Sequence, residues 1–314
     1  MKTVFMLILS LAVIGLANYY CQGGWGEEGE EPGQFKAPIF ITVQAGGNVY
    51  VTDTTLNRVQ YFTPVGSYLG QWGEWGTGQG QFEHPQGIAI SANNTVYVAD
   101  WFTNRIKYYT QTGSFLGSWS ITGGSMENPN APRGLAISPV GNVYLADLGM
   151  SRIQYFTPAG SLIGSFGYAD ADPLEAPTGI AIDLNSKVYV TDATKNRAVY
   201  YTEEGSLLGQ FGSTGSGPGQ FQGIAGIHVS SSGTIFVTDN ILSRVQYFTS
   251  GGIFVGSFGV PGIKPGRLGG PFGIVTVGDE LVYVANTDNS CILFFGQNLK
   301  VEPTTLGKVR SLFH

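Results

Sequence analysis

Apolar residues along the chain gather in short runs that are separated by Gly, Asn, Ser and Pro. Between residues 85 and 119 the runs are GIAIS, TVYVAD, RIKYYT and FLGSW, and the segments SANN, WFTN and QTGS stand between them. Short runs rich in Val, Ile, Tyr and Phe, bounded by turn residues, predict β-strands. Runs such as IAI and VYV are apolar on both sides, so we expect both faces of each sheet to be covered.

This unit of four predicted strands returns six times. An acidic or amide marker recurs at Asp53, Asp100, Asp147, Asp192, Asp239 and Asn286, at intervals of 47, 47, 45, 47 and 47 residues. A period in the forties with four strands in each unit is typical of a β-propeller blade. The sequence therefore predicts an all-β fold, a six-bladed β-propeller of four-stranded antiparallel blades.

The first residues after the apolar N-terminus resemble the end of a unit. Residues 18–35, NYYCQGGWGEEGEEPGQF, match residues 66–82, GSYLGQWGEWGTGQGQF, and align Trp25 with Trp72. We predict that this N-terminal strand completes blade six, which closes the ring and leaves no free edge. In the same alignment Cys21 and Cys291 lie four residues apart along the strands, about 13 Å. That separation argues against a disulfide between them.

The N-terminus has the pattern of an export signal. Lys2 precedes an apolar run that is short for a membrane span, and Gly15 and Ala17 are the small residues of a cleavage site. We expect a signal peptide at 1–17, the propeller at 18–298 and a C-terminal tail at 299–314, in a secreted, periplasmic or cell-surface protein with no membrane span after cleavage. An uncleaved anchor is the alternative.

Composition narrows the range of partners. The chain has 47 Gly in 314 residues, 13% aromatic and only 12% charged residues, and a net charge of −6. Nucleic acids and anionic lipids bind clustered Lys and Arg, and the 16 basic residues here are dispersed. We expect no nucleic-acid partner.

Each repeated Asp stands five residues before an Arg, across a four-residue loop. The two then lie side by side at the base of a hairpin, where opposite charges pair. The sixth copy has Asn286 and Cys291 and loses both charges together, as expected when losing one alone would leave a buried charge uncompensated. We assign a structural role to five ion pairs: Asp53–Arg58, Asp100–Arg105, Asp147–Arg152, Asp192–Arg197 and Asp239–Arg244.

The segments PQGIAIS, NTVYVAD and NRIKYYTQTGSFLGSW, with their copies over about 18–296, resemble the NHL repeat family. The resemblance implies a six-bladed propeller. It does not imply one function, because the family includes RNA-binding, protein-binding, sensor and enzymatic domains. Function must therefore be argued from the positions at which one copy differs from the others.

Strand directions place the loops between second and third strands on the same face as the segments that cross between blades; we call this the variable-loop face. Its candidate binding residues differ from copy to copy and are mostly apolar: Trp101, Phe102, Leu148, Met150, Lys195, Ile241 and Leu242 in the loops, with Arg133 and Phe272 at the mouth of the central channel. They predict a partner surface with Trp101 as its anchor. Packing against neighbouring loops is the other interpretation.

Candidate chemistry is sparse. His228 replaces a small inner-strand residue and is expected near the channel. The NHL-type amidating lyases and the streptogramin lyases resemble this scaffold and use several channel histidines, whereas this chain has only His84, His228 and His314. We therefore expect no metal site and no catalytic residue. Asp170, Asp172 and Glu175 offer oxygens for Ca²⁺, but the full loop pattern is absent, so we expect a solvated loop and no cofactor.

The sequence thus favours an exported, non-catalytic propeller that binds a protein, peptide or glycan on its variable-loop face. Two alternatives remain open. One is a metal-assisted propeller lyase or lactonase with Arg133 and His228 near the channel. The other is an extracellular structural subunit that assembles with copies of itself.

Overall fold

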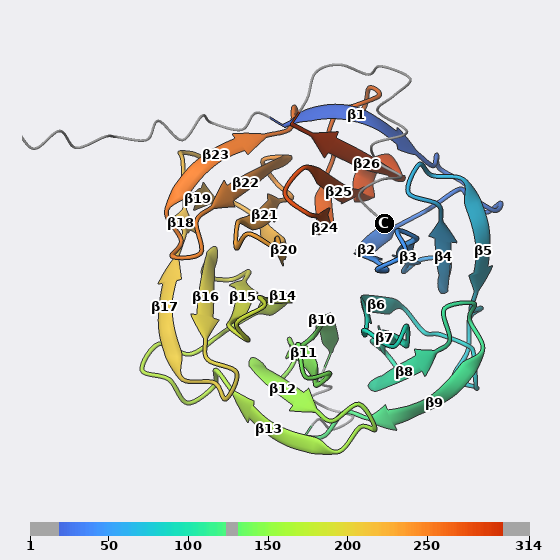
Figure 1. Cartoon of the computed structure of the whole chain (residues 1–314), viewed down its shortest axis with the longest axis horizontal. Helices are drawn as coiled ribbons and strands as arrows, with labels where there is room; N and C mark the ends of the chain where they lie inside the picture. Colours follow the sequence, from blue (N-terminus) through green and yellow to red (C-terminus); the bar gives the residue numbers. More distant parts are fainter. Residues whose placement is uncertain (1–18, 124–130, 298–314) are drawn as a thin grey trace, which may run out of the picture.

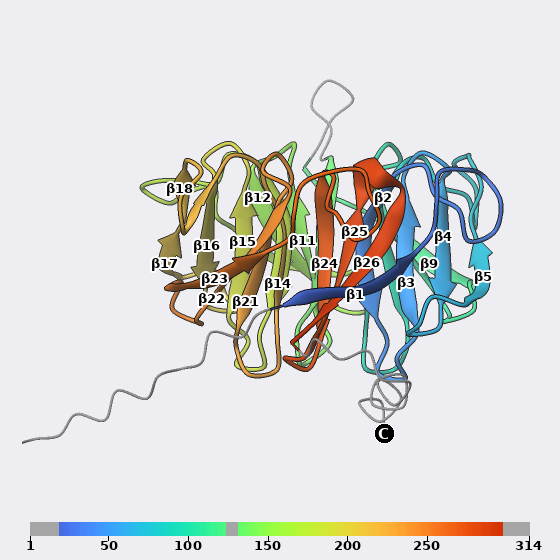
Figure 2. The same ribbon diagram turned by 90° about the horizontal axis from the view of Figure 1, so that it is seen from above.

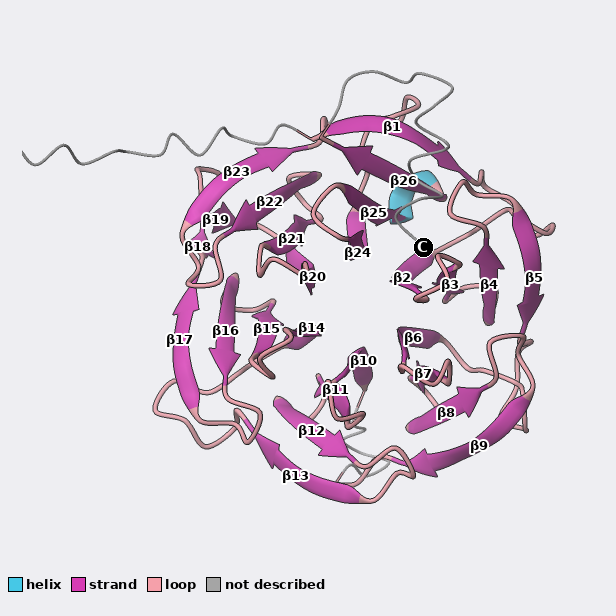
Figure 3. Ribbon diagram, in the orientation of Figure 1, coloured by secondary structure: helices cyan, strands magenta, loops and turns pink. Residues whose placement is uncertain are grey.

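A computed structural model describes residues 19–123 and 131–297. Six four-stranded antiparallel sheets surround a common axis, and the one helix of the described residues is the short 3₁₀ helix η1 (Thr287–Asn289) (Figures 1 and 3). The predicted all-β, six-bladed propeller is confirmed. The predicted signal peptide, 1–17, and tail, 299–314, lie outside the described residues.

In blades one to five the four strands follow one another from the axis outward. Blade one has β2 (Pro38–Val43), β3 (Val49–Asp53), β4 (Arg58–Phe62) and β5 (Tyr68–Trp72); blade two has β6 (Pro85–Ile90), β7 (Val96–Asp100), β8 (Arg105–Tyr109) and β9 (Phe115–Ser120). Blade three has β10 (Pro132–Ile137), β11 (Val143–Asp147), β12 (Arg152–Phe156) and β13 (Leu162–Phe166); blade four has β14 (Pro177–Ile182), β15 (Val188–Asp192), β16 (Arg197–Tyr201) and β17 (Leu207–Phe211). Blade five has β20 (Ile224–Val229), β21 (Ile235–Asp239), β22 (Arg244–Phe248) and β23 (Phe254–Phe258), after the short parallel pair β18 (Ser213–Thr214) and β19 (Gln220–Phe221).

Blade six joins the two ends of the chain. It has β24 (Pro271–Val277), β25 (Leu281–Asn286) and β26 (Cys291–Gly296), and its outermost strand is β1 (Tyr20–Trp25) (Figure 2). Trp25 pairs with Ile292 and Tyr20 with Gly296, so the predicted closure is confirmed. Cys21 pairs with Phe295, four residues from Cys291, and both thiols are free.

Close packing between blades explains two kinds of repeated glycine. Gly226 stands in the inner strand β20, and a Cβ there would lie 2.1 Å from the carbonyl oxygen of Phe272 in the next blade. Gly113 has φ +90° in an outer turn, and a Cβ there would lie 2.7 Å from the Trp72 indole of the preceding blade. Adjacent blades therefore meet backbone to backbone at the axis and ring to turn at the rim.

In blades one, two, four and five the repeated Asp holds the segment that crosses into its own blade. Asp239 is fully buried, and its carboxylate accepts hydrogen bonds from the backbone N–H groups of Gln222 (3.2 Å), Gly223 (3.0 Å) and Leu242 (3.1 Å). Asp53 accepts three equivalent bonds. In blade six the amide oxygen of Asn286 accepts one from Gly269 N–H (2.6 Å). A neutral amide oxygen can accept this hydrogen bond without a counter-charge. This explains why Asn can replace Asp in the blade that lacks the Arg.

The ion pairs vary more than the repeat suggests. Every Asp pairs in register with its Arg, and three pairs have N–O distances within 4 Å: Asp147–Arg152 (3.3 Å), Asp192–Arg197 (3.3 Å) and Asp239–Arg244 (3.7 Å). The other two assignments need correction.

In blade two the carboxylate of Asp100 pairs with Lys107 (2.8 Å), which replaces a Gln of other blades, and Arg105 turns to the hydroxyls of Ser118 and Ser120. In blade one, among the described residues, Asp53 and Arg58 form no ion pair within 4 Å. The guanidinium of Arg58 donates to Gln71 and to carbonyl oxygens of the crossing segment instead.

Replacing Asp239 tests the carboxylate contact. Asp239→Ala leaves three backbone N–H groups without their acceptor and Arg244 without its counter-charge. We expect a loss of about 3 to 5 kcal/mol in the free energy of unfolding, measured by urea denaturation. Asp239→Asn/Arg244→Cys, which copies blade six, should lose less, and the exposed control Glu204→Ala should be neutral. A loss below about 1 kcal/mol for Asp239→Ala would contradict the assignment.

Removing β1 tests the closure. A chain that begins at Gly26 exposes the edge of β26, and exposed edges pair with other chains. We expect a lower melting temperature than for a chain that begins at Tyr19, together with concentration-dependent association in light scattering. If the shorter chain stays monomeric and melts at the same temperature, β1 is not needed to close the ring.

Candidate functional site

Two predicted candidates come together on the variable-loop face, beside the channel mouth, between blades two and three. The guanidinium carbon of Arg133, on β10, lies 4.6 Å from the centroid of the Trp101 ring. The Trp101 ring stacks on Phe102, with centroids 5.4 Å apart, and the Phe102 ring lies 4.8 Å from His84. We call these residues, together with Gln86, the mouth cluster.

The Arg133 guanidinium is only partly satisfied. One terminal nitrogen donates to the side-chain oxygen of Gln86 (3.0 Å), whereas the buried Nε has no hydrogen-bond partner among the described residues. Burial lowers the pKa of Arg133. No ion pair that joins two described residues includes Arg133. The Trp101 ring offsets part of the cost of desolvating the charge, because an aromatic face attracts a cation.

His84 belongs to the mouth cluster although its sequence motif gave no reason to select it. Its backbone N–H donates to the side-chain oxygen of Asn57 (2.8 Å) and its φ is +62°. In the part of the chain that the structure describes, its buried Nδ1 has no hydrogen-bond partner. The corresponding positions in the other copies are all Ala or Gly: Ala37, Ala131, Ala176, Gly223 and Gly270. The size of this side chain relative to those copies was the available signal.

Most of the side chains that line the central channel are apolar. It encloses about 240 Å³, lined by the six inner strands. His228 is the polar exception on β20, and its Nδ1 accepts hydrogen bonds from the backbone N–H (3.3 Å) and the hydroxyl (3.1 Å) of Thr276. Burial lowers the pKa of His228 to about 4, so the ring is neutral at pH 7.

His228 and Arg133 do not form one site. Arg133 is the second residue of β10 and His228 the fifth of β20, on non-adjacent blades. Three positions along an inner strand span about 10 Å of the channel. The histidine therefore lies toward the far end of the channel from the mouth cluster.

Two further candidates line a second hollow on the variable-loop face. Ile241, whose side chain is 65% exposed, and Phe272 border a space of about 520 Å³ between blades five and six. The Phe272 ring also packs against Phe40, with centroids 5.2 Å apart. Met150 is half-buried and contacts other residues.

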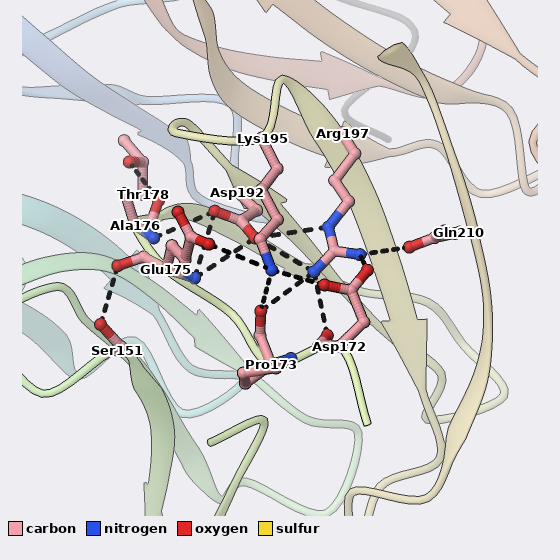
Figure 4. Close-up of polar contacts among 10 residues, drawn as sticks. All are labelled: Ser151, Asp172, Pro173, Glu175, Ala176, Thr178, Asp192, Lys195, Arg197 and Gln210. Carbon is pink, nitrogen blue, oxygen red and sulfur yellow. Dashed lines mark hydrogen bonds and ion pairs between the residues drawn. The ribbon is translucent and has the colours of Figure 1, made fainter. Parts of the chain in front are cut away.

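Lys195 is engaged in a charged network in blade four (Figure 4). Its ammonium pairs with Asp172 (2.5 Å) and Glu175 (3.4 Å), and Arg197 binds the same Asp172 carboxylate. The acidic segment was expected to be a solvated loop, and Asp172 and Glu175 are both exposed. Their carboxylates also pair with cations of blade four. The Lys195 ammonium is therefore already paired with carboxylates of its own blade.

In the described part of the chain, no three His, Cys, Asp or Glu residues are grouped so that they could hold a metal ion. Within the same residues, no helix is long and apolar enough to cross a membrane.

Solved structures with the same architecture include enzymes. Virginiamycin B lyase from Staphylococcus aureus matches with a TM-score of 0.63 and 16% identity, over 89% of this chain and 99% of the lyase. A putative gluconolactonase matches with a TM-score of 0.64 and 16% identity, over 88% of this chain and 93% of that one. A protein of unknown function from Bacteroides thetaiotaomicron matches with a TM-score of 0.67 and 14% identity, over 89% of this chain and 76% of that one.

No protein-family model and no curated protein sequence matches the chain. Identities this low show the fold alone. The six-bladed propeller is therefore established, whereas membership of the NHL family is not.

The half-buried channel histidine, His228, should make the stability of the fold depend on pH. Its folded pKa of about 4 lies below the unfolded value near 6.5, so between these values only the unfolded chain takes up the proton. The free energy of unfolding should fall as the pH drops through this window, by about 3 kcal/mol in total. Between pH 7 and pH 4.5 the melting temperature should fall less for His228→Ala than for wild type. This variant introduces the Ala that three other blades have at the same position.

Asp147 titrates in the same window with the opposite sign, because burial raises its pKa to about 6. Asp147 titrates in wild type and in His228→Ala alike. The difference between their pH profiles of stability therefore reports the contribution of the histidine. Parallel pH profiles for the two would contradict the assignment.

Proposed function

We propose that this protein is a ligand-binding propeller whose mouth cluster binds a carboxylate on a protein or peptide partner. The observation that carries the proposal is the Arg133 guanidinium, which is packed on Trp101, donates to neutral Gln86 and, among the described residues, has no hydrogen-bond partner for its buried Nε–H and no carboxylate paired with it. A desolvated cation without a counter-charge is costly. A ligand carboxylate that accepts from Arg133 removes that cost with a charge-assisted hydrogen bond.

Aromatic neighbours define the other half of the ligand. Phe102 is 58% exposed and stacks on Trp101, so a flat apolar surface adjoins the cation. Aromatic side chains and Arg are enriched among the residues that dominate binding energy at interfaces. The ligand should therefore present a carboxylate next to an apolar group, as a peptide with a hydrophobic C-terminal residue does.

The extent of the face favours a macromolecular partner. The second hollow, with Ile241 and Phe272, lies on the same variable-loop face, and a ligand that reaches both sites has the size of a peptide or a protein loop. A glycan is the alternative ligand. We further propose that binding occurs outside the cytoplasm, which rests on the export signal expected at residues 1–17.

A second candidate is a propeller lyase or lactonase. The likeness in fold to virginiamycin B lyase and to a putative gluconolactonase favours it, as does a neutral histidine in the channel. Incubating the purified protein with a streptogramin B and with gluconolactone, before and after treatment with EDTA, tests this function. Turnover that EDTA abolishes would favour the enzyme over the binding module.

Peptide selection tests the binding function. We expect a displayed peptide library to enrich sequences with a carboxylate beside an apolar residue. Synthetic versions should bind Arg133→Gln and Trp101→Ala at least tenfold more weakly than wild type, measured by calorimetry, because each variant removes one half of the recognition.

The control for this experiment is Leu184→Ser. Leu184 is exposed in the turn between β14 and β15, on the opposite face, and its replacement should leave affinity unchanged. Equal affinity of wild type, Arg133→Gln and Trp101→Ala for every enriched peptide would reject the mouth cluster as the site. Light scattering on the same samples distinguishes a monomeric binder from a self-assembling subunit.

A further inference from the structure

Blade six contains a pocket that the mouth cluster does not use. It has a volume of about 370 Å³ and lies between the crossing segment 259–268 and the outer strands β1 and β26. Its walls include Trp25, Gly24, Cys291 and Leu293. The same place in two other blades is filled by an arginine of the chain itself.

In blade five the guanidinium of Arg244 donates to three carbonyl oxygens of the preceding crossing segment, those of Ser216 (3.0 Å), Gly217 (3.1 Å) and Gln220 (2.7 Å). In blade one Arg58 donates to the carbonyl oxygens at the same three loop positions, those of Glu30 (2.8 Å), Glu31 (3.2 Å) and Gln34 (2.8 Å). This crossing is therefore a guanidinium receptor built from backbone carbonyls.

The crossing of blade six has the same backbone. Its internal bonds run from Gly262 N–H to Leu268 (2.9 Å), from Leu268 N–H to Val260 (2.9 Å) and from Arg267 N–H to Lys264 (3.0 Å). The three equivalent bonds of blade one join Gly29 to Phe35, Phe35 to Glu27 and Gln34 to Glu31. The carbonyl groups of Ile263, Lys264 and Arg267 thus correspond to those that bind Arg58 and Arg244.

The side chains that would occupy this receptor are absent in blade six. By position, Arg58 becomes Cys291, Gln60 becomes Leu293, Gln71 becomes Gly24 and Asp53 becomes Asn286. In blade one Gln60 also accepts from Gly33 N–H (2.8 Å) and donates to Gln34 O (2.7 Å). Because these four replacements are shorter or less polar, the space that Arg58 and its neighbours fill in blade one is an empty pocket in blade six.

Two of the three acceptors remain available. The carbonyl of Arg267 already accepts from the side-chain amides of Asn286 (2.9 Å) and Asn289 (3.1 Å). Among bonds between described residues, the carbonyl of Ile263 has no donor. That of Lys264 accepts only the loop bond from Arg267, as the matching carbonyls of blades one and five do while they also bind an arginine.

We propose that this pocket binds the guanidinium group of an arginine side chain supplied by a partner. The lining side chains Glu27 and Glu28 balance Lys264 and Arg267 in formal charge, so recognition rests on the directed carbonyl acceptors. A guanidinium is planar and presents several donors in a fixed array, whereas an ammonium is a compact point charge that is strongly hydrated. Arginine should therefore bind in preference to lysine.

Titration with N-acetyl-arginine amide, followed by calorimetry in the presence of a reductant, tests the pocket. We expect saturable binding and at least tenfold weaker binding of N-acetyl-lysine amide. Asn286→Asp/Cys291→Arg restores the ion pair and the arginine of the other blades. This variant should lose at least tenfold in affinity for the arginine probe and melt at a higher temperature, because the chain then fills its own receptor.

Cys291→Met fills the pocket without a charge and serves if the double variant does not fold; it should also lose at least tenfold. The exposed control Leu184→Ser should bind as wild type does. Equal affinity for the arginine and lysine probes, no saturable binding, or undiminished binding in a folded pocket-filling variant would each overturn the proposal. Because Arg133 and Trp101 lie outside this pocket, failure here leaves the function proposed for the mouth cluster untouched.

Discussion

The buried oxygen at the end of each second strand is the contact on which the variable-loop face depends. A carboxylate in blades one, two, four and five and an amide in blade six bind backbone N–H groups of the crossing segment. In blades one and five the neighbouring arginine binds the same segment by donating to backbone carbonyl groups of that segment. Loops that vary in sequence are thus held by a constant frame, which lets the composition of the face change while the backbone stays in place.

Chemistry is concentrated where one copy departs from this frame. Blade two replaces Gln with Lys107 and carries the aromatic pair Trp101 and Phe102, and blade three adds an arginine at the channel mouth. Blade six loses a whole polar set and gains a pocket. Because the chain contains six copies of one unit, each position can be compared with its equivalents in the other blades. An empty pocket or an unpaired group in one blade is then recognised from the filled or paired position in another.

Much of the architecture was readable from the sequence, because strand length, turn residues and a period near 47 are local signals that six copies reinforce. The match of Trp25 to Trp72 likewise predicted the closing strand. The ion pairs were less predictable. The hydrogen bonds that Asp53 accepts come from backbone N–H groups, which leave no pattern in the sequence. In blade two, the cation that pairs with Asp100 is Lys107, two residues after the expected Arg105. The packing of Arg133 on Trp101 joins two blades, which no single repeat reveals.

Closure by β1 has a consequence for how the protein reaches its native state. The strand that is synthesised first pairs with one synthesised about 270 residues later, as the spacing of Trp25 and Ile292 shows. Contacts between such distant segments form late and slow folding, because a long loop must be ordered first. Blades one to five can form during synthesis. The pairing of β1 with β26 must wait until the C-terminal strand has been synthesised. Until then the nascent ring carries an open edge that invites misassembly.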